Sequence, residues 1–427
     1  MKKLLLGSAA LLMAGSVWAA PLQDVAERYT KLVLAIGQHD ANYVDAYYGP
    51  PQWQEEAARQ KRPLKELRAD AGATLKLLAG QQGADADDTL RIEFLNKQLA
   101  AMQAYIDMLD GKKFSFDEET ARLYDAVTPH HTRAYYESLV GEIAQLLPGS
   151  GPVTERLKAF RQQFVIPADR LRPVMDAAIR ACRERTAPHI GLPAQESFTL
   201  EFVTGKPWSG YNWYKGQSRS LIQINTEFPI YIDRAVDLGC HEGYPGHHVY
   251  NALLEQSLVK GKGWVEYSVY PLQSPMSLIA EGSANYGIEL AFSEDERLEF
   301  EQKVLFPLAG LDPALAPQYA RLRRLLSKLS YADNDAAMQY LDGSFTRAQT
   351  IDWLVNVQLY PPEKSAQRVQ FYDTVRSYVI NYNLGADLVK AYVQRHATAN
   401  DPQQARAQRW AAFRALLSSP RLASGLR

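Results

Sequence analysis

The sequence predicts a mainly α-helical fold with one small β-sheet of about three strands. Apolar residues recur at helical spacing through most of the 427 residues. Alternation of apolar and polar residues, which is the period of a half-buried strand, is limited to the stretch between residues 198 and 225. Glycines and prolines interrupt the helical pattern and separate it into successive helices.

The N-terminus has the pattern of a secretory signal peptide. Lys2 and Lys3 precede an apolar run from residue 4 to residue 17, and a small residue, Ala19, follows at a suitable cleavage point. The run is too short and too rich in small residues for a good membrane span. We therefore expect cleavage after Ala19 and a periplasmic or secreted protein with no membrane span in its mature part.

After the signal peptide (1–19) we expect an N-terminal helical region at 20–190. The remainder, 191–427, is expected to form one continuous unit that contains the sheet and the C-terminal helices. In the N-terminal region, helices are predicted at 22–38, 53–80, 87–110, 117–127, 131–147, 153–166 and 168–187. The segment at 42–51 is rich in tyrosine, glycine and proline and is expected to be an ordered loop.

Three strands are predicted at 198–204, 211–215 and 220–225, followed by a helix at 230–240. Pro245 and Gly246 must interrupt that helix, which resumes at residue 247. Ser274 is expected to cap the next helix, with Pro275 in its first turn. Ser293 and Glu296 form a capping box for the helix after that. Further helices are predicted at 317–341, 346–359, 366–381, 385–396 and 402–417.

Charge and cysteine content limit the functional classes. The formal net charge is −1, and no block of basic residues occurs, so a nucleic-acid-binding surface is not expected. The chain has two cysteines, Cys182 and Cys240. Export permits a disulfide, although their positions in the sequence do not show that they meet. We expect Cys240 to be a small buried residue rather than a thiolate ligand of a metal.

Residues 241–248 carry the strongest chemical signal in the chain. Three of the eight histidines fall in this octapeptide, and Glu242 directly follows His241. Histidine is the commonest metal ligand, and a glutamate beside a metal-bound water is the general base of zinc hydrolases. The octapeptide therefore predicts part of a zinc site with its base, Glu242, built in.

The spacing of the histidines leaves two candidates for the second ligand. In the usual HExxH arrangement the histidines are four residues apart, but here that position is Pro245. On a straight helix a residue six positions on lies roughly 120° off the ligand face, and one seven positions on lies about 10.5 Å along the axis. The Pro-Gly pair supplies the distortion that either needs. His247 is favoured, and His248 remains the alternative.

Glu281 is the best candidate for a third protein ligand. Catalytic zinc commonly has three protein ligands and a water. Glu281 lies in a predicted helix among apolar and small residues, where a carboxylate is costly to bury unless it is paired or bound to a metal. Gly282 and Ala284 allow another element to approach closely. Asn285, one turn on, is placed to hydrogen-bond a metal ligand.

These residues resemble the motifs of a bacterial family catalogued as domain of unknown function 885. Residues 241–248 are similar to its HExxPGHH motif, and Glu281 to Tyr286 is similar to its EGxAxY motif. Asn225-Thr226 ahead of a helix bearing Arg234, and residues 382–385, are also similar. Ser283 departs from the tryptophan often found there, which bears on the shape of the pocket more than on the metal.

The resemblance, which is clear over about 200–390, implies a largely helical, zincin-like metallopeptidase fold. It also implies one Zn²⁺ on His241, His247 or His248, and Glu281, with Glu242 as base. Tyr286 and Arg234 are expected to support the ligands or contact the substrate.

The predicted reaction is hydrolysis of a peptide or small amide by zinc-activated water, with proton transfer through Glu242. Tyr382 is our candidate for the donor that stabilises the oxyanion, with Tyr378, Arg376 and the remaining histidine as alternatives. The strand at 220–225 is expected to be an edge strand that pairs with an extended substrate. The competing hypotheses are an inactive metal-binding or interaction protein and a zinc hydrolase of a non-peptide amide or ester.

Overall fold

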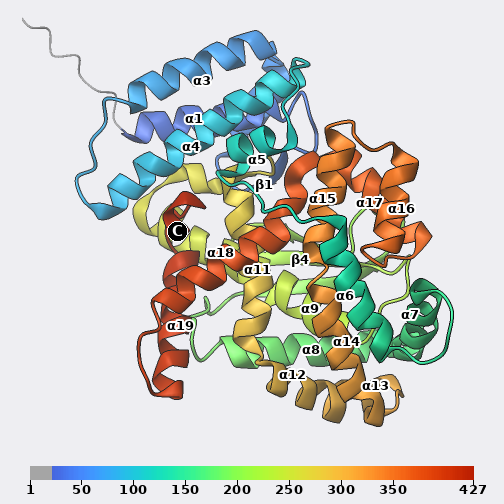
Figure 1. Cartoon of the computed structure of the whole chain (residues 1–427). Helices are drawn as coiled ribbons and strands as arrows, with labels where there is room; N and C mark the ends of the chain where they lie inside the picture. Colours follow the sequence, from blue (N-terminus) through green and yellow to red (C-terminus); the bar gives the residue numbers. More distant parts are fainter. Residues whose placement is uncertain (1–21) are drawn as a thin grey trace, which may run out of the picture.

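Helices make up most of the computed structural model, which describes residues 22–427 (Figure 1). The predicted signal peptide and its cleavage point after Ala19 lie outside these residues. The mainly helical class with a small sheet is confirmed, but the described part contains two small sheets rather than one. No helix in residues 22–427 is long and apolar enough to cross a membrane.

The first helices form a layer at one end of the molecule, drawn in blue and cyan in Figure 1. They are α1 (Leu22–Ile36), α2 (Pro51–Gln60), α3 (Leu64–Leu78) and α4 (Ala86–Leu109). The single helix predicted at 53–80 is wrong, because the chain breaks between α2 and α3. Lys61 takes a left-handed conformation there, and Pro63 cannot donate a helical hydrogen bond.

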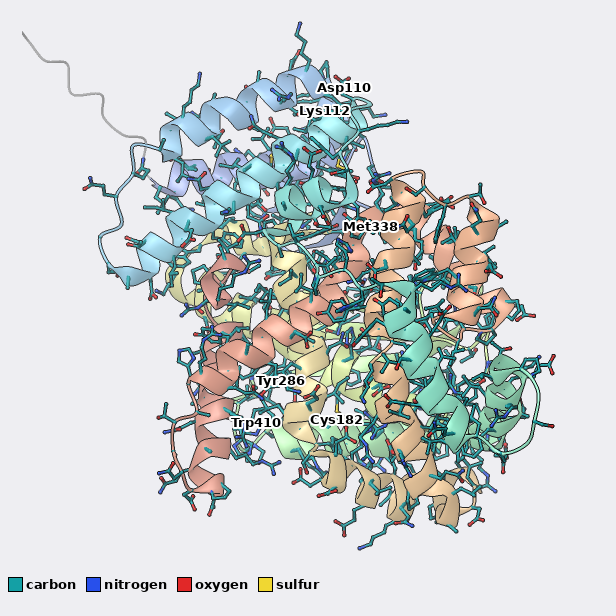
Figure 2. The ribbon with its side chains drawn as sticks, in the orientation of Figure 1. Asp110, Lys112, Cys182, Tyr286, Met338 and Trp410 are labelled. Atoms are coloured by element: carbon teal, nitrogen blue, oxygen red, sulfur yellow. A yellow bond between two sulfur atoms is a disulfide. The ribbon has the colours of Figure 1, made fainter. Side chains whose placement is uncertain are left out.

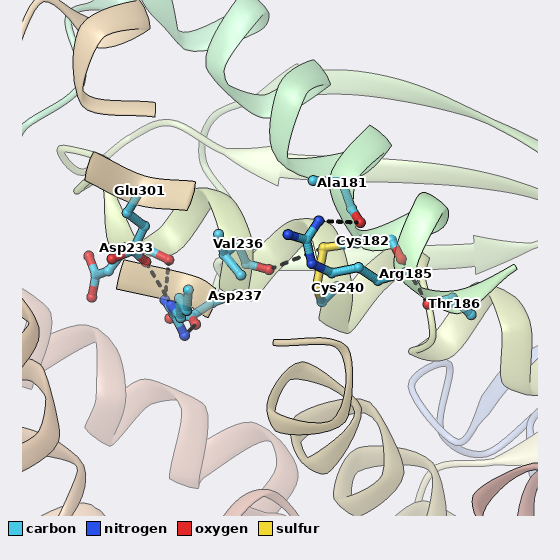
Figure 3. Close-up of a disulfide and its surroundings, with 10 residues drawn as sticks. Ala181, Cys182, Arg185, Thr186, Asp233, Val236, Asp237, Cys240 and Glu301 are labelled. Atoms are coloured by element: carbon cyan, nitrogen blue, oxygen red, sulfur yellow. Dashed lines mark hydrogen bonds and ion pairs between the residues drawn. A yellow bond between two sulfur atoms is a disulfide. The ribbon is translucent and has the colours of Figure 1, made fainter. Parts of the chain in front are cut away.

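The next four helices lead to the three-stranded sheet. They are α5 (Phe116–Tyr124), α6 (Arg133–Leu146), α7 (Val153–Arg161) and α8 (Leu171–Thr186). Short 3₁₀ turns at Gln162–Phe164 and Ala168–Arg170 account for the ends of the longer helices predicted here. α8 runs below the sheet in Figure 1, and the disulfide Cys182–Cys240 joins it to the segment that carries His241 (Figure 3).

The three predicted strands are confirmed as β2 (Ser197–Val203), β3 (Gly210–Tyr214) and β4 (Arg219–Asn225). The order is β2-β4-β3, with β4 parallel to β2 and antiparallel to β3. Positive φ angles at Gly216, Gln217 and Ser218 form the tight connection between β3 and β4. The predicted edge position of residues 220–225 is wrong, because β4 is the central strand.

A second, two-stranded sheet joins the start of the chain to its middle. β1 (Val44–Tyr47) pairs antiparallel with β5 (Val269–Pro271). Residues 44–47 fall in the segment predicted as a loop. Strands this short have little periodicity of their own, so the pairing depends on a partner that lies far along the chain.

The helix predicted at 230–240 is α9 (Asp233–Leu238), extended by a π-helical turn at Gly239–Gly243. α10 (His247–Leu254) follows and ends in a second π-helical segment at Glu255–Lys260. A 3₁₀ turn at Val265–Ser268 leads to β5, and then α11 (Pro275–Ala291) begins. Ser274 precedes α11 as predicted, but its side chain does not cap the helix, since the hydroxyl donates to the Pro271 carbonyl at 2.7 Å.

The remaining helices follow α11 along the chain. They are α12 (Glu294–Phe300), α13 (Phe306–Ala309), α14 (Ala316–Ser327), α15 (Ser330–Leu341), α16 (Arg347–Asn356), α17 (Pro362–Val375), α18 (Ile380–Arg395) and α19 (Pro402–Leu417). The capping box of Ser293 and Glu296 is confirmed at α12. The helix predicted at 317–341 is two helices, α14 and α15. α18 crosses α11 near the centre of the molecule (Figure 1).

Candidate metal centre

Gly246 determines how the octapeptide folds back on itself. Its N–H donates to the Cys240 carbonyl at 3.0 Å, and the Tyr244–Pro245 peptide bond is cis. A Cβ atom at Gly246 would lie 1.8 Å from the carbonyl oxygen of His241, so no other residue fits there without movement of the backbone. The chain therefore starts α10 directly against the π-helical turn, and His247 comes to lie beside His241.

Among residues 22–427, His241, His247 and Glu281 form a cluster suited to a metal ion. The Nε2 atoms of the two histidines are 3.1 Å apart. Glu281 Oε2 lies 3.2 Å from His241 Nε2 and 3.5 Å from His247 Nε2. Donor atoms bound to one tetrahedral zinc ion at about 2.0–2.1 Å are about 3.3 Å from one another. The three side chains thus fit a single zinc ion in both donor type and spacing.

The orientation of His241 is fixed from behind by Asn285. His241 Nδ1 lies 2.9 Å from Asn285 Oδ1, and the Asn285 amide donates to the Tyr382 carbonyl at 2.8 Å. The amide nitrogen of Asn285 donates to a carbonyl, so the side-chain oxygen of Asn285 must accept from Nδ1–H of His241. The proton is therefore on Nδ1, and the lone pair of Nε2 faces the cluster. The predicted contact between Asn285 and a candidate ligand is therefore present.

Glu281 is a buried carboxylate that lacks a full set of hydrogen bonds. The Tyr378 hydroxyl donates to Oε1 at 2.8 Å, whereas Oε2 receives no hydrogen bond among the described residues and faces the two histidines. Burial favours the neutral acid, but the neighbouring His247 and His241 outweigh it and hold the pKa of Glu281 well below its ordinary value. A buried, ionised and incompletely satisfied oxygen is the kind of group that a cation stabilises.

A close helix crossing brings this glutamate to the site. α11 and α18 approach so closely at Gly282 and Gly385 that a Cβ on Gly282 would lie 2.3 Å from the Gly385 carbonyl carbon. The sequence predicted a close approach at Gly282, and the structure identifies α18 as the partner. The crossing places Tyr378 and Tyr382 against Glu281 and His241.

Glu242 lies next to the cluster with one oxygen free. Its side chain is buried, and Oε2 has no hydrogen-bond partner among residues 22–427. β3 packs against it, since a Cβ at Gly210 would lie 2.7 Å from Glu242 Oε1 and the Asn212 amide donates to the Glu242 carbonyl at 2.8 Å. Burial raises the pKa of the Glu242 carboxyl, although His241 and His247 oppose the shift. A buried carboxylate with a free oxygen beside candidate metal ligands suits the role of a proton acceptor.

His248 does not join the cluster, so its inclusion among the predicted metal ligands is corrected. Its ring is completely buried, with Nδ1 2.8 Å from Ser220 Oγ and Nε2 3.0 Å from Glu196 Oε2. Both ring nitrogens are therefore occupied, and His248 connects α10 to the sheet. Cys240 is not a ligand either, because its sulfur is bonded to that of Cys182.

The remaining predicted residues have different positions. The Tyr382 ring centre is 6.5 Å from that of His241, and its hydroxyl has no hydrogen bond within residues 22–427. Arg234 is half-buried and bonds Asp237 at 3.3 Å, and its positive charge opposes the rise that burial causes in the pKa of Glu242. Tyr286 does not reach the cluster. It packs in the core on the other side of α11, with its ring centre 6.0 Å from that of Phe413, near Trp410 (Figure 2).

Asp45 is a candidate site residue that the sequence did not reveal. It lies on β1 and accepts a hydrogen bond from the Tyr211 hydroxyl. Burial raises its pKa to about 7; the positive charge of His247 opposes this shift, and the charges of Glu281 and Glu242 add to it. Asp45 reaches the site only through the pairing of β1 with β5, and no local motif marks it.

Comparisons with known proteins show only remote similarity. No protein-family model and no curated protein sequence matches the chain. A presumed lipoprotein from Colwellia psychrerythraea is 12% identical with a TM-score of 0.49, covering 85% of this chain and 71% of its own. One of unknown function from Shewanella oneidensis is 12% identical with a TM-score of 0.44, covering 85% and 75%. A protein named BsuCP is 10% identical with a TM-score of 0.46, covering 93% and 88%.

Proposed function

We propose that this protein is an exported zinc-dependent metallohydrolase that cleaves peptide bonds, with Glu242 as general base. The observation that carries the proposal is the grouping of His241, His247 and Glu281 within 3.5 Å of one another beside a buried Glu242 oxygen without a partner. A purely metal-binding protein has no need of that free carboxylate. The resemblance to the domain of unknown function 885 family supports the same activity.

Each residue of the site has a separate role in the proposed hydrolysis. A bound zinc ion would lower the pKa of a coordinated water to roughly 7 and polarise the substrate carbonyl. Glu242 accepts the proton of the attacking water through Oε2 and returns it to the departing amine. We assign donation to the oxyanion that develops on the carbonyl to the hydroxyl of Tyr382, whose ring centre is 6.5 Å from that of His241. Asn285 holds the His241 ring throughout.

β3 is the strand we propose for contact with the substrate backbone. It is an edge strand of the sheet, and its residues Gly210 and Asn212 touch Glu242. An extended peptide that adds to the edge of β3 would pass beside the base. This proposal replaces β4, whose two edges are both occupied.

Export is supported by the signal-peptide pattern and by the buried disulfide. Disulfides persist in oxidising compartments such as the periplasm. Cys182 and Cys240 are the two cysteines of the chain, and they are joined to each other. We propose that the disulfide forms after export.

The experiment that tests the function compares metal content and hydrolysis. Purified protein should contain about one zinc per chain and should cleave members of a mixed peptide library. Glu242→Gln should retain zinc and lose activity by about 10²-fold or more. His241→Ala should lose both zinc and activity. Full activity of Glu242→Gln, or wild-type protein that binds zinc and cleaves no peptide, would contradict the proposal.

A further inference from the structure

Three cationic side chains lie close enough together for their charges to interact, and one of them also acts on Glu242. Lys364 and Arg368 lie one turn apart on α17, and Arg234 lies on α9. The positive charges of Arg368 and Arg234 both act on Lys364, and that of Arg234 also acts on Glu242. All three side chains are half-buried and therefore keep some contact with solvent.

The carboxylates around these cations pair with the two arginines and leave Lys364 without one. Asp333 pairs with Arg368 through two contacts to Nε at 3.0 and 2.9 Å and a shorter one to Nη2. Asp237, at 3.3 Å from Arg234, is shared with Arg297 at 2.8 Å.

Lys364 has no carboxylate within 4.0 Å among residues 22–427, and its ammonium donates to Gln367 Oε1 at 2.6 Å. Burial, with help from the two arginines, lowers its pKa to about 8. An ammonium group has three donors, so Lys364 retains capacity for an anion.

The three cations lie next to the proposed reacting groups. The Arg368 guanidinium is 5.9 Å from the centre of the Tyr382 ring, which in turn is 6.5 Å from that of His241. Gln367 also donates to the Lys206 carbonyl at 3.1 Å, which ties α17 to the turn between β2 and β3. That turn leads to Gly210, the residue that touches Glu242. A substrate chain that runs along β3 would therefore pass close to these cations.

We propose that Lys364, together with Arg234 and Arg368, binds a carboxylate of the substrate next to the bond that is cleaved. The proposal rests on the function proposed above and specifies its substrate class. The carboxylate has two sources. If it is the α-carboxylate of a C-terminal residue, the enzyme removes residues from the C-terminus. If it is an aspartate or glutamate side chain, the enzyme cuts internally beside an acidic residue.

Binding measurements on the zinc-loaded Glu242→Gln protein test this proposal independently of turnover. The probes are acetyl-Ala-Ala-Ala, its C-terminal amide, and the amides of acetyl-Ala-Glu-Ala and acetyl-Ala-Gln-Ala, studied by isothermal titration calorimetry. We expect a carboxylate-bearing peptide to bind about ten- to a hundredfold more tightly than its neutral counterpart. A preference in the first pair identifies the α-carboxylate, and one in the second pair identifies the side chain. Equal affinities within both pairs would overturn the proposal.

Substitutions assign the preference to Lys364. In the same background, Lys364→Met should reduce the preference to within about threefold, whereas Lys364→Arg should keep part of it. Lys390→Met is the matched control, because Lys390 is a half-buried lysine of α18 that is paired with Glu289. A preference that survives in Lys364→Met protein of unchanged Tm would refute the assignment.

The result is separable from the test of hydrolysis. Selective carboxylate binding by a protein whose zinc-loaded wild type cleaves no member of the mixed peptide library would reject the proposed function and leave this inference standing. Cleavage by the wild-type protein without selective carboxylate binding would support the proposed function and reject this inference.

Discussion

His247 and His248 are neighbours in the sequence, but they have different partners. His247 faces His241 and Glu281, while His248 is enclosed by Ser220 and Glu196. The difference arises at Gly246, whose lack of a side chain lets the backbone pass against the His241 carbonyl. Two adjacent histidines therefore have different roles: His247 is a candidate metal ligand and His248 a structural contact.

Alanine substitutions should distinguish the two histidines. His247→Ala should lose bound zinc, because two of three protein ligands remain. His248→Ala should keep about one zinc per chain and lose about 1–3 kcal/mol of unfolding free energy, since Ser220 and Glu196 lose a buried partner. Metal analysis and urea unfolding of both variants check this. Loss of zinc from His248→Ala alone would contradict the assignment.

The protonation of His247 predicts how zinc binding depends on pH. Burial lowers its pKa, but Glu281, Glu242 and Asp45 outweigh this and raise it to about 9 in the metal-free protein. A proton must leave Nε2 before that atom can bind a metal. Zinc affinity should therefore rise by up to about tenfold per pH unit from pH 6 towards pH 9. Competition titrations with a chelator of known pH dependence measure this, and an affinity that is flat between pH 6 and pH 8 would contradict it.

At the scale of elements, the crossing of α11 and α18 brings ligand and support together. α11 carries Glu281 and Asn285, and α18 carries Tyr382, which lies against His241. The two helices can approach because Gly282 and Gly385 face each other backbone to backbone. The small residues around Glu281 therefore allow α11 to pack against α18, and this packing also positions Glu281 in the cluster.

Gly282→Ala should test this crossing. The added methyl would meet the Gly385 backbone at 2.3 Å, so the helices must separate, at a cost of about 1–3 kcal/mol or more. Zinc affinity should fall as well, because Glu281 moves with α11. Gly141→Ala in α6 is the control, since its Cβ has no neighbour within 4 Å and should stabilise the protein by about 0.4–1 kcal/mol. Chemical unfolding of the two variants should give shifts of opposite sign.

At the scale of the whole molecule, the cluster depends on segments from all parts of the chain. β1 supplies Asp45, the octapeptide supplies the histidines and the base, and α11 supplies Glu281, while the cations come from α17 and α9. The disulfide ties α8 to the turn that carries His241 across 58 residues of sequence (Figure 3). The sequence division at residue 190 therefore separates segments that pack together.

Removal of the disulfide should destabilise the fold. Replacing Cys182 and Cys240 with alanine frees a loop of 58 residues in the unfolded chain, which should lower the unfolding free energy by about 2–4 kcal/mol. Urea unfolding of the zinc-loaded double variant, compared with the oxidised wild type, measures the change. An unchanged midpoint would show that the crosslink does not contribute to stability.

Local sequence patterns determined the helices, the three strands of the larger sheet and most of the cluster. His241 and Glu242 stand out because three histidines and a glutamate fall within eight residues. Glu281 stands out because a carboxylate among apolar and small residues is costly to bury unless it is paired or bound to a metal. The break between α2 and α3 and the division of α14 from α15 were missed, because helical periodicity continues across a short interruption.

The tertiary structure alone decided the contacts between residues distant in the chain. It selected His247 over His248, placed β4 in the centre of its sheet, moved Tyr286 into the core and brought Asp45 to the cluster. It also joined Cys182 to Cys240. Spacing along a helix or strand fixes only which residues share a face. Which face meets which partner depends on the direction that a turn such as the one at Gly246 gives the chain and on packing between elements, and the local sequence specifies neither.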